Sequence, residues 1–267
     1  MGFPAPSADG TALITGASSG IGAEFALQLA AAGHGVALVA RRAERLHALA
    51  GELRARFGVR AEVLPCDLTD ADARAALPGR LADAGLRVDV LVNNAGFATG
   101  GPFHESDLED ELRQVQLLCE APLDLARRFL PAMVERHEGA VIAVASTAGI
   151  QPLPHSAGYS AAKAHTLAFA EAVHEEVRRH GVHVTALCPP PVRTELFEKT
   201  DHPVERVPRI AWLDPDEVVR IGLDGARRNK RVVVPKALAR IQAVVSRHAP
   251  HALGLPLAER VFRPHGG

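Results

Sequence analysis

The sequence predicts an α/β protein in which a parallel sheet, expected to have seven strands, is doubly wound by helices into a three-layer sandwich. Two observations lead to this fold class. Short β-branched or aliphatic runs alternate with Ala- and Leu-rich helical segments along most of the 267 residues, which is the rhythm of βαβ units. The apolar runs also lack an alternating polar face, as expected for strands that are covered on both sides.

The first half of the chain is expected to contain four strands. Their apolar runs lie at residues 11–15, 35–40, 61–65 and 88–92. The helical segments between them cover residues 20–33, residues 44–57 and a stretch that begins after Thr69. A short polar side chain such as Thr69 is typical of a helix N-cap.

The second half continues the alternation before it becomes irregular. We expect a helix near 107–135, a strand at 140–145, a helix near 158–180 and a strand at 182–188. Prolines interrupt the next segment, about 190–215, until a helix resumes near Asp216. The run at 231–235 predicts an edge strand that Pro235 ends. Amphipathic helices are expected at 236–247 and 256–263, in a tail that spans about 236–267.

Length and composition fit one domain over residues 1–267, because the chain suffices for a single large core and contains no internal repeat or Gly/Ser linker. The formal net charge of −1 at pH 7 argues against an extended basic surface that binds nucleic acid. No stretch approaches the roughly eighteen consecutive apolar residues of a membrane span, and the first ten residues lack the features of a secretion signal. We therefore expect a cytoplasmic protein with no membrane span and no nucleic-acid partner.

Cysteine and histidine usage predicts neither a disulfide framework nor a metal site. Cys66, Cys119 and Cys188 are widely separated and form no C-x-x-C pair. The 13 histidines show no ligand spacing such as H-E-x-x-H. We expect three buried thiols and no bound metal.

A glycine-rich turn, TGASSGIG at residues 15–22, follows the first expected strand and opens a helix. Glycines allow a tight turn and a close approach of the backbone to phosphate oxygens, and the N–H groups of a helix start favour an anion. A strand-to-helix connection can use glycines merely to turn, but this placement favours a dinucleotide site. The candidate contacts are Gly16, Ser18, Ser19, Gly20, Ile21 and Gly22.

Further motifs accompany the glycine spacing G-x-x-x-G-x-G. Asn93-Asn94-Ala95-Gly96 follows the fourth expected strand, Tyr159-Ser160-Ala161-Ala162-Lys163 begins a helix, and Ser146 stands thirteen positions before Tyr159. In this order the set resembles the short-chain dehydrogenase/reductase family over roughly residues 11–195. The resemblance implies a Rossmann fold, a nicotinamide cofactor and hydride transfer between a carbonyl and an alcohol.

The end of the second expected strand, Val39-Ala40-Arg41-Arg42, favours NADP(H) over NAD. An acidic residue here binds the free 2′-hydroxyl of NAD, whereas an arginine suits the 2′-phosphate of NADP. Ala40 stands at the acidic position, and Arg41, with Arg42 beside it, offers the donors that phosphate accepts. If these arginines are only the solvated start of a helix, an NAD-dependent dehydrogenase is the alternative. The resemblance implies further cofactor contacts at Asp67, Leu68, Asn93, Ala95, Gly96, Pro189, Val192 and Thr194.

Tyr159 and Lys163 are four residues apart on an expected helix, so their side chains share one face. The pKa of an unperturbed phenol, about 10, is too high for efficient proton exchange at neutral pH. We expect a neighbouring ammonium and the positive nicotinamide of the oxidised cofactor to lower it. The resemblance implies that Tyr159 exchanges a proton with the substrate oxygen, that Lys163 also holds the nicotinamide ribose, and that Ser146 positions the substrate oxygen. Outside this motif set, a Tyr and a Lys on an Ala-rich helix are ordinary packing and surface residues.

Two positions depart from the family pattern. The family commonly has an Asn in the long fourth helix, where it supports a water-linked proton relay to the lysine, and the matching segment here is Val115-Gln116-Leu117. Gln116 either preserves the relay with a shifted water, slows it, or is an ordinary polar helix residue. The family's Pro-Gly pair after the sixth strand reads Pro189-Pro190 here, and proline cannot adopt the positive φ of glycine. This loop either seats nicotinamide poorly or is extended and merely stiffened.

The favoured function is that of a carbonyl reductase or alcohol dehydrogenase for a small or medium, largely apolar substrate. The segment at about 190–215 is expected to form a lid, and the expected pocket wall comprises Phe97, Leu153, His155, Pro190, Phe197 and Trp212. A different class is a nucleotide-binding sensor or scaffold on the same fold, with chemistry weakened by Gln116 and Pro190. The helices that carry Gln116 and Tyr159 resemble those that pair subunits in the family, so we expect a homodimer or homotetramer.

Overall fold

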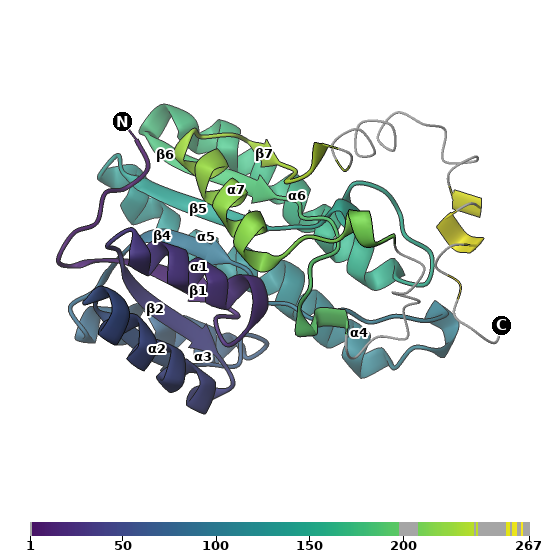
Figure 1. Ribbon diagram of the computed structural model, residues 1–267, viewed down its shortest axis with the longest axis horizontal. Coiled ribbons are helices and arrows are strands. Elements are labelled where there is room, and N and C mark those ends of the chain that lie inside the picture. Colours follow the sequence, from purple (N-terminus) through teal and green to yellow (C-terminus); the bar gives the residue numbers. More distant parts are fainter. Residues whose placement is uncertain are drawn as a thin grey trace.

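The computed structural model describes residues 2–197 and 208–237, together with residues 239, 255, 256, 258–260 and 263. At its centre lies a seven-stranded sheet in the order β3-β2-β1-β4-β5-β6-β7, and all neighbouring strands in it are parallel. Helices cover this sheet on both faces (Figure 1). The predicted doubly wound three-layer architecture is therefore confirmed.

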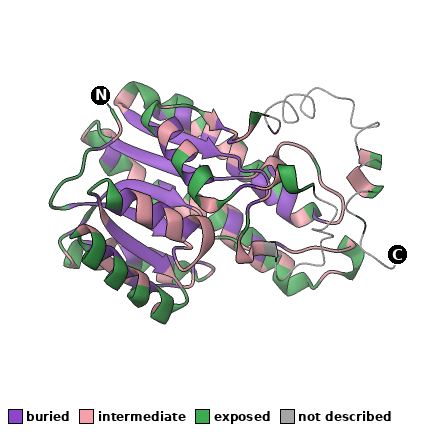
Figure 2. Cartoon of the chain, in the orientation of Figure 1, coloured by how far each residue is buried: buried purple, intermediate pink, exposed green. Residues whose placement is uncertain are grey.

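The strands lie where the apolar runs placed them, within one or two residues at most ends. Their bounds are β1 Gly10–Thr15, β2 Gly35–Ala40, β3 Ala61–Pro65, β4 Arg87–Asn93, β5 Gly139–Val144, β6 Val182–Leu187 and β7 Val232–Val233. Every residue of β1, β5 and β6 is buried, and Figure 2 shows this buried layer through the middle of the molecule. A strand that is covered on both faces needs no polar alternation, which is why the runs are largely apolar. The polar His183 and Thr185 of β6 are buried as well, and each contacts a backbone carbonyl oxygen.

Two helical layers pack on the sheet through separate apolar clusters. One face is covered by α1 (Gly20–Ala31), α2 (Ala43–Phe57) and α7 (Pro215–Arg227), and the other by α3 (Ala71–Asp83), α5 (Ala121–Glu135) and α6 (Ala157–Val177). Short 3₁₀ turns lie at Phe103–Glu105, Thr147–Gly149, Arg178–His180, Glu195–Phe197 and Arg209–Ala211. Burial of these apolar faces is the main favourable contribution to folding.

The N-cap of α3 differs from the prediction. It is Asp70, whose carboxylate accepts hydrogen bonds from the N–H groups of Asp72 and Ala73. Thr69 instead donates its N–H and its hydroxyl to Asp67. Both residues are of types that can cap a helix, so composition alone does not distinguish them.

The long helix expected near 107–135 contains an irregularity. It runs as α4 (Leu108–Val115), a π-helical segment at Gln116–Glu120, and then α5. A π turn inserts an additional residue and rotates the side chains that follow it. A regular helical period does not predict such an insertion.

The sheet brings the ends of β1, β2, β4, β5 and β6 to one edge. β2 lies on one side of β1 and β4 on the other, so the strand order reverses at β1. In an open parallel sheet, ligands bind at the carboxyl ends of the strands at such a switch point. The fold thus collects the glycine loop and the segments after the other four strands around one crevice.

The irregular segments are described in part. Residues 198–207 of the expected lid and most of the expected helix at 236–247 lie outside the described residues. Of the helix expected at 256–263, residues 256 and 258–260 are helical, as is residue 255, whereas residue 263 is not. Within the described ranges, no helix combines the length and apolar character that a bilayer crossing requires.

Candidate active site

The glycine loop, residues 16–19, joins β1 to α1. Gly16 and Gly20 have φ angles of 68° and 55°, which glycine adopts without steric cost. A Cβ on Gly22 would lie 2.2 Å from the carbonyl oxygen of Gly16, so the loop folds tightly onto the helix start. Ser19 forms no side-chain cap and the first turn of α1 contains no acidic residue. The N–H groups of this helix start can therefore serve an anion.

Thr15 and Asn94 hold this loop, and sequence reasoning missed both as functional residues. The Thr15 hydroxyl donates to the carbonyl of Val92 at 3.1 Å and accepts from the N–H groups of Asn94 and Ala95 at 2.8 and 3.0 Å. The Asn94 side chain donates to the carbonyl of Thr15 at 2.9 Å. The signal was present, because Asn94 belongs to the same Asn-Asn-Ala-Gly motif that nominated its neighbours.

Asn93 has a structural role beside the loop. Its buried side chain donates to the carbonyl of Pro122 at 3.1 Å, which fastens the end of β4 to α5. Gly96, three residues past the end of β4, approaches Lys163 instead. A Cβ there would lie 2.7 Å from Cδ2 of Leu118 and 3.9 Å from Nζ of Lys163, so glycine lets the backbone pass close to the lysine.

Arg42 is the arginine that lies against the glycine loop. Its Nε and Nη2 atoms donate to the Ser18 hydroxyl at 3.0 and 2.9 Å, and Nη2 also donates to the Ser19 hydroxyl at 2.8 Å. Arg41 lies nearer Asp67, with 4.0 Å between Nη1 and Oδ2. The sequence favoured Arg41 as the first phosphate ligand, whereas the structure places Arg42 beside the loop.

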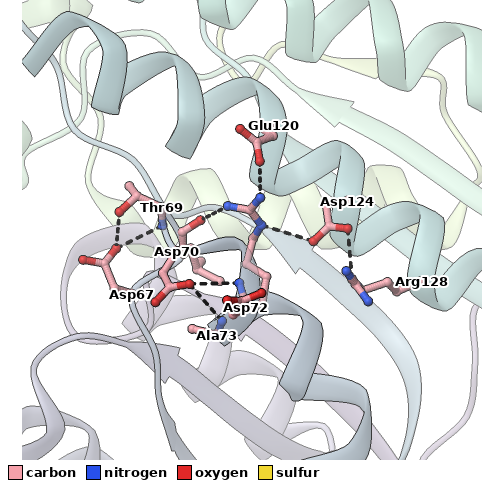
Figure 3. A network of polar contacts seen from close by, with 10 residues as sticks. Asp67, Thr69, Asp70, Asp72, Ala73, Glu120, Asp124 and Arg128 are labelled. Carbon is pink, nitrogen blue, oxygen red and sulfur yellow. Dashed lines mark hydrogen bonds and ion pairs between the residues drawn. The ribbon is translucent and has the colours of Figure 1, made fainter. Parts of the chain in front are cut away.

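Asp67 and Leu68 follow β3 at the same edge of the sheet. Asp67 accepts hydrogen bonds from the N–H and the hydroxyl of Thr69 at 3.0 and 2.8 Å (Figure 3). Burial raises the pKa of Asp67, but these bonds together with the charges of Arg41 and Arg113 outweigh it and hold the pKa below its usual value. Leu68 is buried, and its carbonyl accepts a hydrogen bond of 2.7 Å from Arg74.

Ser146, Tyr159 and Lys163 come together at the ends of β5 and α6. Tyr159 and Lys163 lie one turn apart on α6 and are both buried. The Nζ atom of Lys163 is 5.8 Å from the centre of the Tyr159 ring. Ser146 caps a 3₁₀ turn by accepting a hydrogen bond from the N–H of Ala148 at 3.1 Å, and its side chain also forms a hydrogen bond with the phenol of Tyr159.

Burial controls the titration of this centre. Burial raises the pKa of Tyr159 to about 12, and the hydrogen bond with Ser146 lowers it only in part. Burial lowers the pKa of Lys163 to about 8, against the opposing effects of Cys188 and Cys119. The protein by itself therefore does not supply the lowered phenol pKa that the sequence predicted. That expectation included the positive charge of an oxidised nicotinamide, which stabilises a phenolate.

The structure does not bring Gln116 to this centre. Gln116 is exposed and lines a hollow of about 490 Å³ on the outer face of α4, together with Leu108, Glu109, Leu112 and Arg113. Leu118 of this segment reaches the centre instead, where it packs with Ala98, Tyr159 and Ala162. Residues two apart point to different faces of a helix, so an apolar side chain stands where the sequence suggested an amide.

The segment after β6 is held in place by backbone contacts. The carbonyl of Pro189 accepts a hydrogen bond from Thr147 at 3.0 Å, and the carbonyl of Pro191 accepts one from Leu213 at 3.0 Å. Val192 pairs with Leu213 in a parallel bridge. No residue of 189–191 has a positive φ, so this loop does not use the glycine-like conformation, and the prolines stiffen it.

The expected pocket residues occupy several loops. Phe97, Leu153 and Trp212 are half-buried and Pro190 is buried. His155 has a φ of 62°, and its Nε2 lies 3.2 Å from a carboxylate oxygen of Glu259 in the tail. The side chain of Phe197 lies outside the described residues.

The cysteine side chains are largely buried, and the described side chains form no metal-ligand cluster. Cys66 and Cys188 are buried and Cys119 is half-buried, close to the expectation of three buried thiols. In the part of the chain that the structure describes, no three His, Cys, Asp or Glu side chains are grouped as metal ligands.

Known proteins resemble this chain along most of its length. The model of the short chain dehydrogenase family matches residues 10–205. A fatty acyl-CoA reductase of Acinetobacter baylyi is 33% identical over 242 residues, which cover 90% of this chain and 80% of that protein. A very-long-chain 3-oxoacyl-CoA reductase of Phaeosphaeria nodorum is 32% identical over 223 residues, which cover 82% of this chain and 65% of that protein.

A solved structure agrees with the sequence comparisons. The short-chain dehydrogenase from Sphingobium yanoikuyae in complex with NADPH is 36% identical and superimposes with a TM-score of 0.80, over 92% of this chain and 94% of that chain. The match to the fungal reductase spans slightly less than two thirds of that protein's length. The family model, by contrast, covers most of this chain and all the motifs that form the site. The protein is therefore a member of the short-chain dehydrogenase family of oxidoreductases.

Proposed function

We propose that this protein is an NADP(H)-dependent oxidoreductase that interconverts a carbonyl and an alcohol on a small or medium, largely apolar substrate. The observation that carries this proposal is the meeting of Ser146, Tyr159 and Lys163 next to the end of β5, at the same edge of the sheet as the glycine loop. A hydroxyl, a phenol and an ammonium together provide a donor that orients a carbonyl, a proton source and a local positive charge.

The neighbouring residues fit a nicotinamide dinucleotide. The glycine loop leaves no space for a Cβ on Gly22, and the start of α1 has neither a side-chain cap nor an acidic residue in its first turn. These features suit a pyrophosphate. When bound, the cofactor supplies or accepts the hydride.

Arg42 supports the preference for NADP(H). The strand before it ends at Ala40, which places no carboxylate there, and the Arg42 guanidinium lies against Ser18 and Ser19. A 2′-phosphate at this position meets a planar, permanently charged donor and two hydroxyls. The NADPH complex of the Sphingobium enzyme is consistent with this choice.

The chain's own residues then move one proton. In the reductive direction, Ser146 donates a hydrogen bond to the substrate carbonyl oxygen, and the Tyr159 hydroxyl transfers its proton to that oxygen as the alcohol forms. Lys163 gives one of its N–H groups to the carbonyl of Val144 at 2.7 Å, which leaves two donors for the ribose hydroxyls. In the oxidative direction, the phenolate takes the alcohol proton back.

The test is oxidation of NADPH and NADH by the purified protein against aldehydes, ketones, quinones and 3-oxoacyl thioesters, with Tyr159→Phe as the control. The thioesters are included because relatives carry the names of acyl-CoA and 3-oxoacyl-CoA reductases. Turnover with NADPH that disappears in the variant supports the proposal. Tight NADPH binding without turnover on any carbonyl supports a nucleotide sensor instead, and better turnover with NADH supports the NAD alternative.

We propose further that the protein forms a homodimer or homotetramer through the outer face of α4. Leu108, Leu112 and Val115 are 72%, 55% and 48% exposed along this face, and they recur at helical spacing. An exposed apolar stripe of this kind marks a contact surface. Light scattering at micromolar concentration is expected to give a multiple of the 28.3 kDa chain mass, and a monomer would contradict the assembly.

A further inference from the structure

The carboxylate of Glu195 forms ion pairs with two arginines near the glycine loop, Arg42 and Arg45. One of its oxygens, Oε2, accepts a hydrogen bond from Nη1 of Arg42 at 2.8 Å, and the other, Oε1, accepts one from Nη1 of Arg45 at 2.6 Å. These bonds lower the pKa of Glu195 to about 2. The carboxylate is therefore ionised at every pH at which the enzyme is assayed.

The contacts of Glu195 use the donors that a phosphate needs. Arg42 gives Nε and Nη2 to Ser18 and Ser19, and Nη1 to Glu195. These bonds engage four of the five N–H groups of a guanidinium. A phosphate that enters this site can bind Arg42 fully only if the carboxylate leaves.

The backbone of the segment after β6 places Glu195 at this position. Val192 forms a bridge to Leu213, and the methyl group of Thr194 would lie 2.9 Å from a Cβ on Gly20. Thr194 therefore packs directly against the start of α1, and Glu195 follows it. Two segments about 150 residues apart in the sequence are joined by the resulting ion pairs.

These ion pairs are exposed enough for another anion to replace the Glu195 carboxylate. The side chains of Arg42, Glu195 and Arg45 are 43%, 41% and 51% exposed, so solvent and salt screen their attraction. A phosphate monoester carries roughly −1.5 to −2 charges and three acceptor oxygens, against a single charge and two oxygens for a carboxylate. We therefore expect the phosphate to displace the carboxylate from the two guanidiniums.

We propose that Glu195 determines cofactor specificity by occupying the place of the 2′-phosphate on Arg42 and Arg45, so that NADP(H) binds by displacing it. The inference rests on the proposed NADP(H) dependence. Arg45, which sequence reasoning did not single out, becomes the second ligand of the phosphate. NAD(H) carries only a 2′-hydroxyl, which lacks the charge to displace the carboxylate, and it leaves the Glu195 contacts intact.

The test compares dissociation constants for NADPH, NADH and adenosine 2′,5′-bisphosphate, measured by titration calorimetry, in the wild type and in Glu195→Gln. We expect the variant to bind the two 2′-phosphorylated ligands about three- to tenfold more tightly and to leave NADH unchanged. Glu44→Gln is the matched control. Glu44 lies in the first turn of α2 next to Arg45 and forms no ion pair with Arg42 or Arg45 within the described ranges, so its loss tests the effect of net charge alone.

A second variant isolates the contact with Arg42. In an Arg42→Gln background, Glu195→Gln should no longer tighten NADPH binding to the same extent, because the two changes are coupled. An unchanged or weaker NADPH affinity in Glu195→Gln overturns the displacement, since the carboxylate then does not compete with the phosphate. An equal effect of Glu44→Gln overturns it as well.

The two proposals fail in different ways. If the wild type binds NADH as tightly as NADPH, the NADP(H) dependence itself is wrong. If the wild type prefers NADPH and Glu195→Gln leaves that preference unchanged, only the role of Glu195 is wrong.

Discussion

The Nζ atom of Lys163 donates a hydrogen bond of 2.7 Å to the backbone carbonyl of Val144. This bond joins α6 to the last residue of β5 and fixes the ammonium beside Tyr159. A single carbonyl does not replace the hydration that the buried ammonium loses. Burial therefore lowers the pKa of Lys163 to about 8, close to the pH at which the enzyme is expected to work.

The lowered pKa of Lys163 predicts a contribution to stability that rises with pH from about 8 toward 10. The pKa of the same lysine is about 10.5 in the unfolded chain, so over this range the unfolded state binds more protons than the folded state, and the free energy of unfolding increases with pH. Below pH 8 both states hold the proton and the contribution is constant. The thiols of Cys66, Cys119 and Cys188 act in the opposite direction above pH 9, because burial raises their pKa values in the folded state. Tyr159 does the same above pH 10, because its folded pKa of about 12 exceeds the ordinary value of 10.

Urea denaturation across this pH range checks the prediction. Lys163→Met should remove this rising contribution, so that its slope between pH 8 and 10 is less positive than that of the wild type. Its thermal midpoint at pH 7 should be preserved or increased, since a buried charge is removed. The exposed Lys230 supplies the control, and Lys230→Met should keep the rise. The same pH slope in Lys163→Met and the wild type would refute the assignment.

Arg42→Gln is predicted to weaken NADPH binding by about 10- to 100-fold and to change NADH binding little, because charge-assisted hydrogen bonds to the 2′-phosphate are lost. Arg41→Gln should have a smaller effect, since Arg41 lies near Asp67 rather than against Ser18. The ratio of kcat/KM for the two cofactors measures both. A larger loss in Arg41→Gln would restore Arg41 as the main phosphate ligand.

Gln116→Ala is predicted to keep kcat/KM within about twofold of the wild type, because an exposed side chain outside the centre contributes little. The apolar neighbour of Tyr159 in this helix is Leu118, which cannot hold a water by hydrogen bonds. A tenfold or greater fall in the rate for Gln116→Ala would show that Gln116 moves to the centre during turnover.

Arg74→Met is predicted to destabilise the protein by roughly 2–3 kcal/mol. The substitution removes a buried guanidinium and leaves its hydrogen-bond acceptors without their donor. The side chain of Arg74 is only 2% exposed, and its guanidinium binds the carbonyl of Leu68, Asp124 at 3.1 Å and Glu120. Figure 3 shows Asp124 also facing Arg128. Arg128→Met, which removes an outer and more exposed partner of the same carboxylate, should cost no more than about 0.5 kcal/mol. Equal losses in urea denaturation would contradict the buried role of Arg74.

The fold, and the meeting of Ser146, Tyr159 and Lys163 at one place, could be predicted because they depend on local patterns. The strands were visible as apolar runs that need no polar face, and Tyr159 and Lys163 were visible through their spacing on one helix. The glycine loop was visible through its position after β1. Each of these signals lies within about twenty consecutive residues.

The remaining features depend on contacts between distant segments. The contact of Arg42, rather than Arg41, with Ser18 follows from how the chain leaves β2. The contact of Glu195 with Arg42 joins residues that are 153 positions apart. Leu118, rather than Gln116, lies next to Tyr159 because of which face of α4 and the π segment packs inward. The raised pKa of Tyr159 depends on its burial. None of these can be derived from a linear motif.

The most direct test of the account is the steady-state rate of carbonyl reduction by Tyr159→Phe at saturating NADPH. Removing the phenol hydroxyl removes the proton donor but leaves the ring and the glycine loop in place. We predict a fall in kcat of about 100- to 10,000-fold with an unchanged dissociation constant for NADPH. Retention of most of the activity in Tyr159→Phe would contradict the assignment of Tyr159 as the acid and base of the reaction.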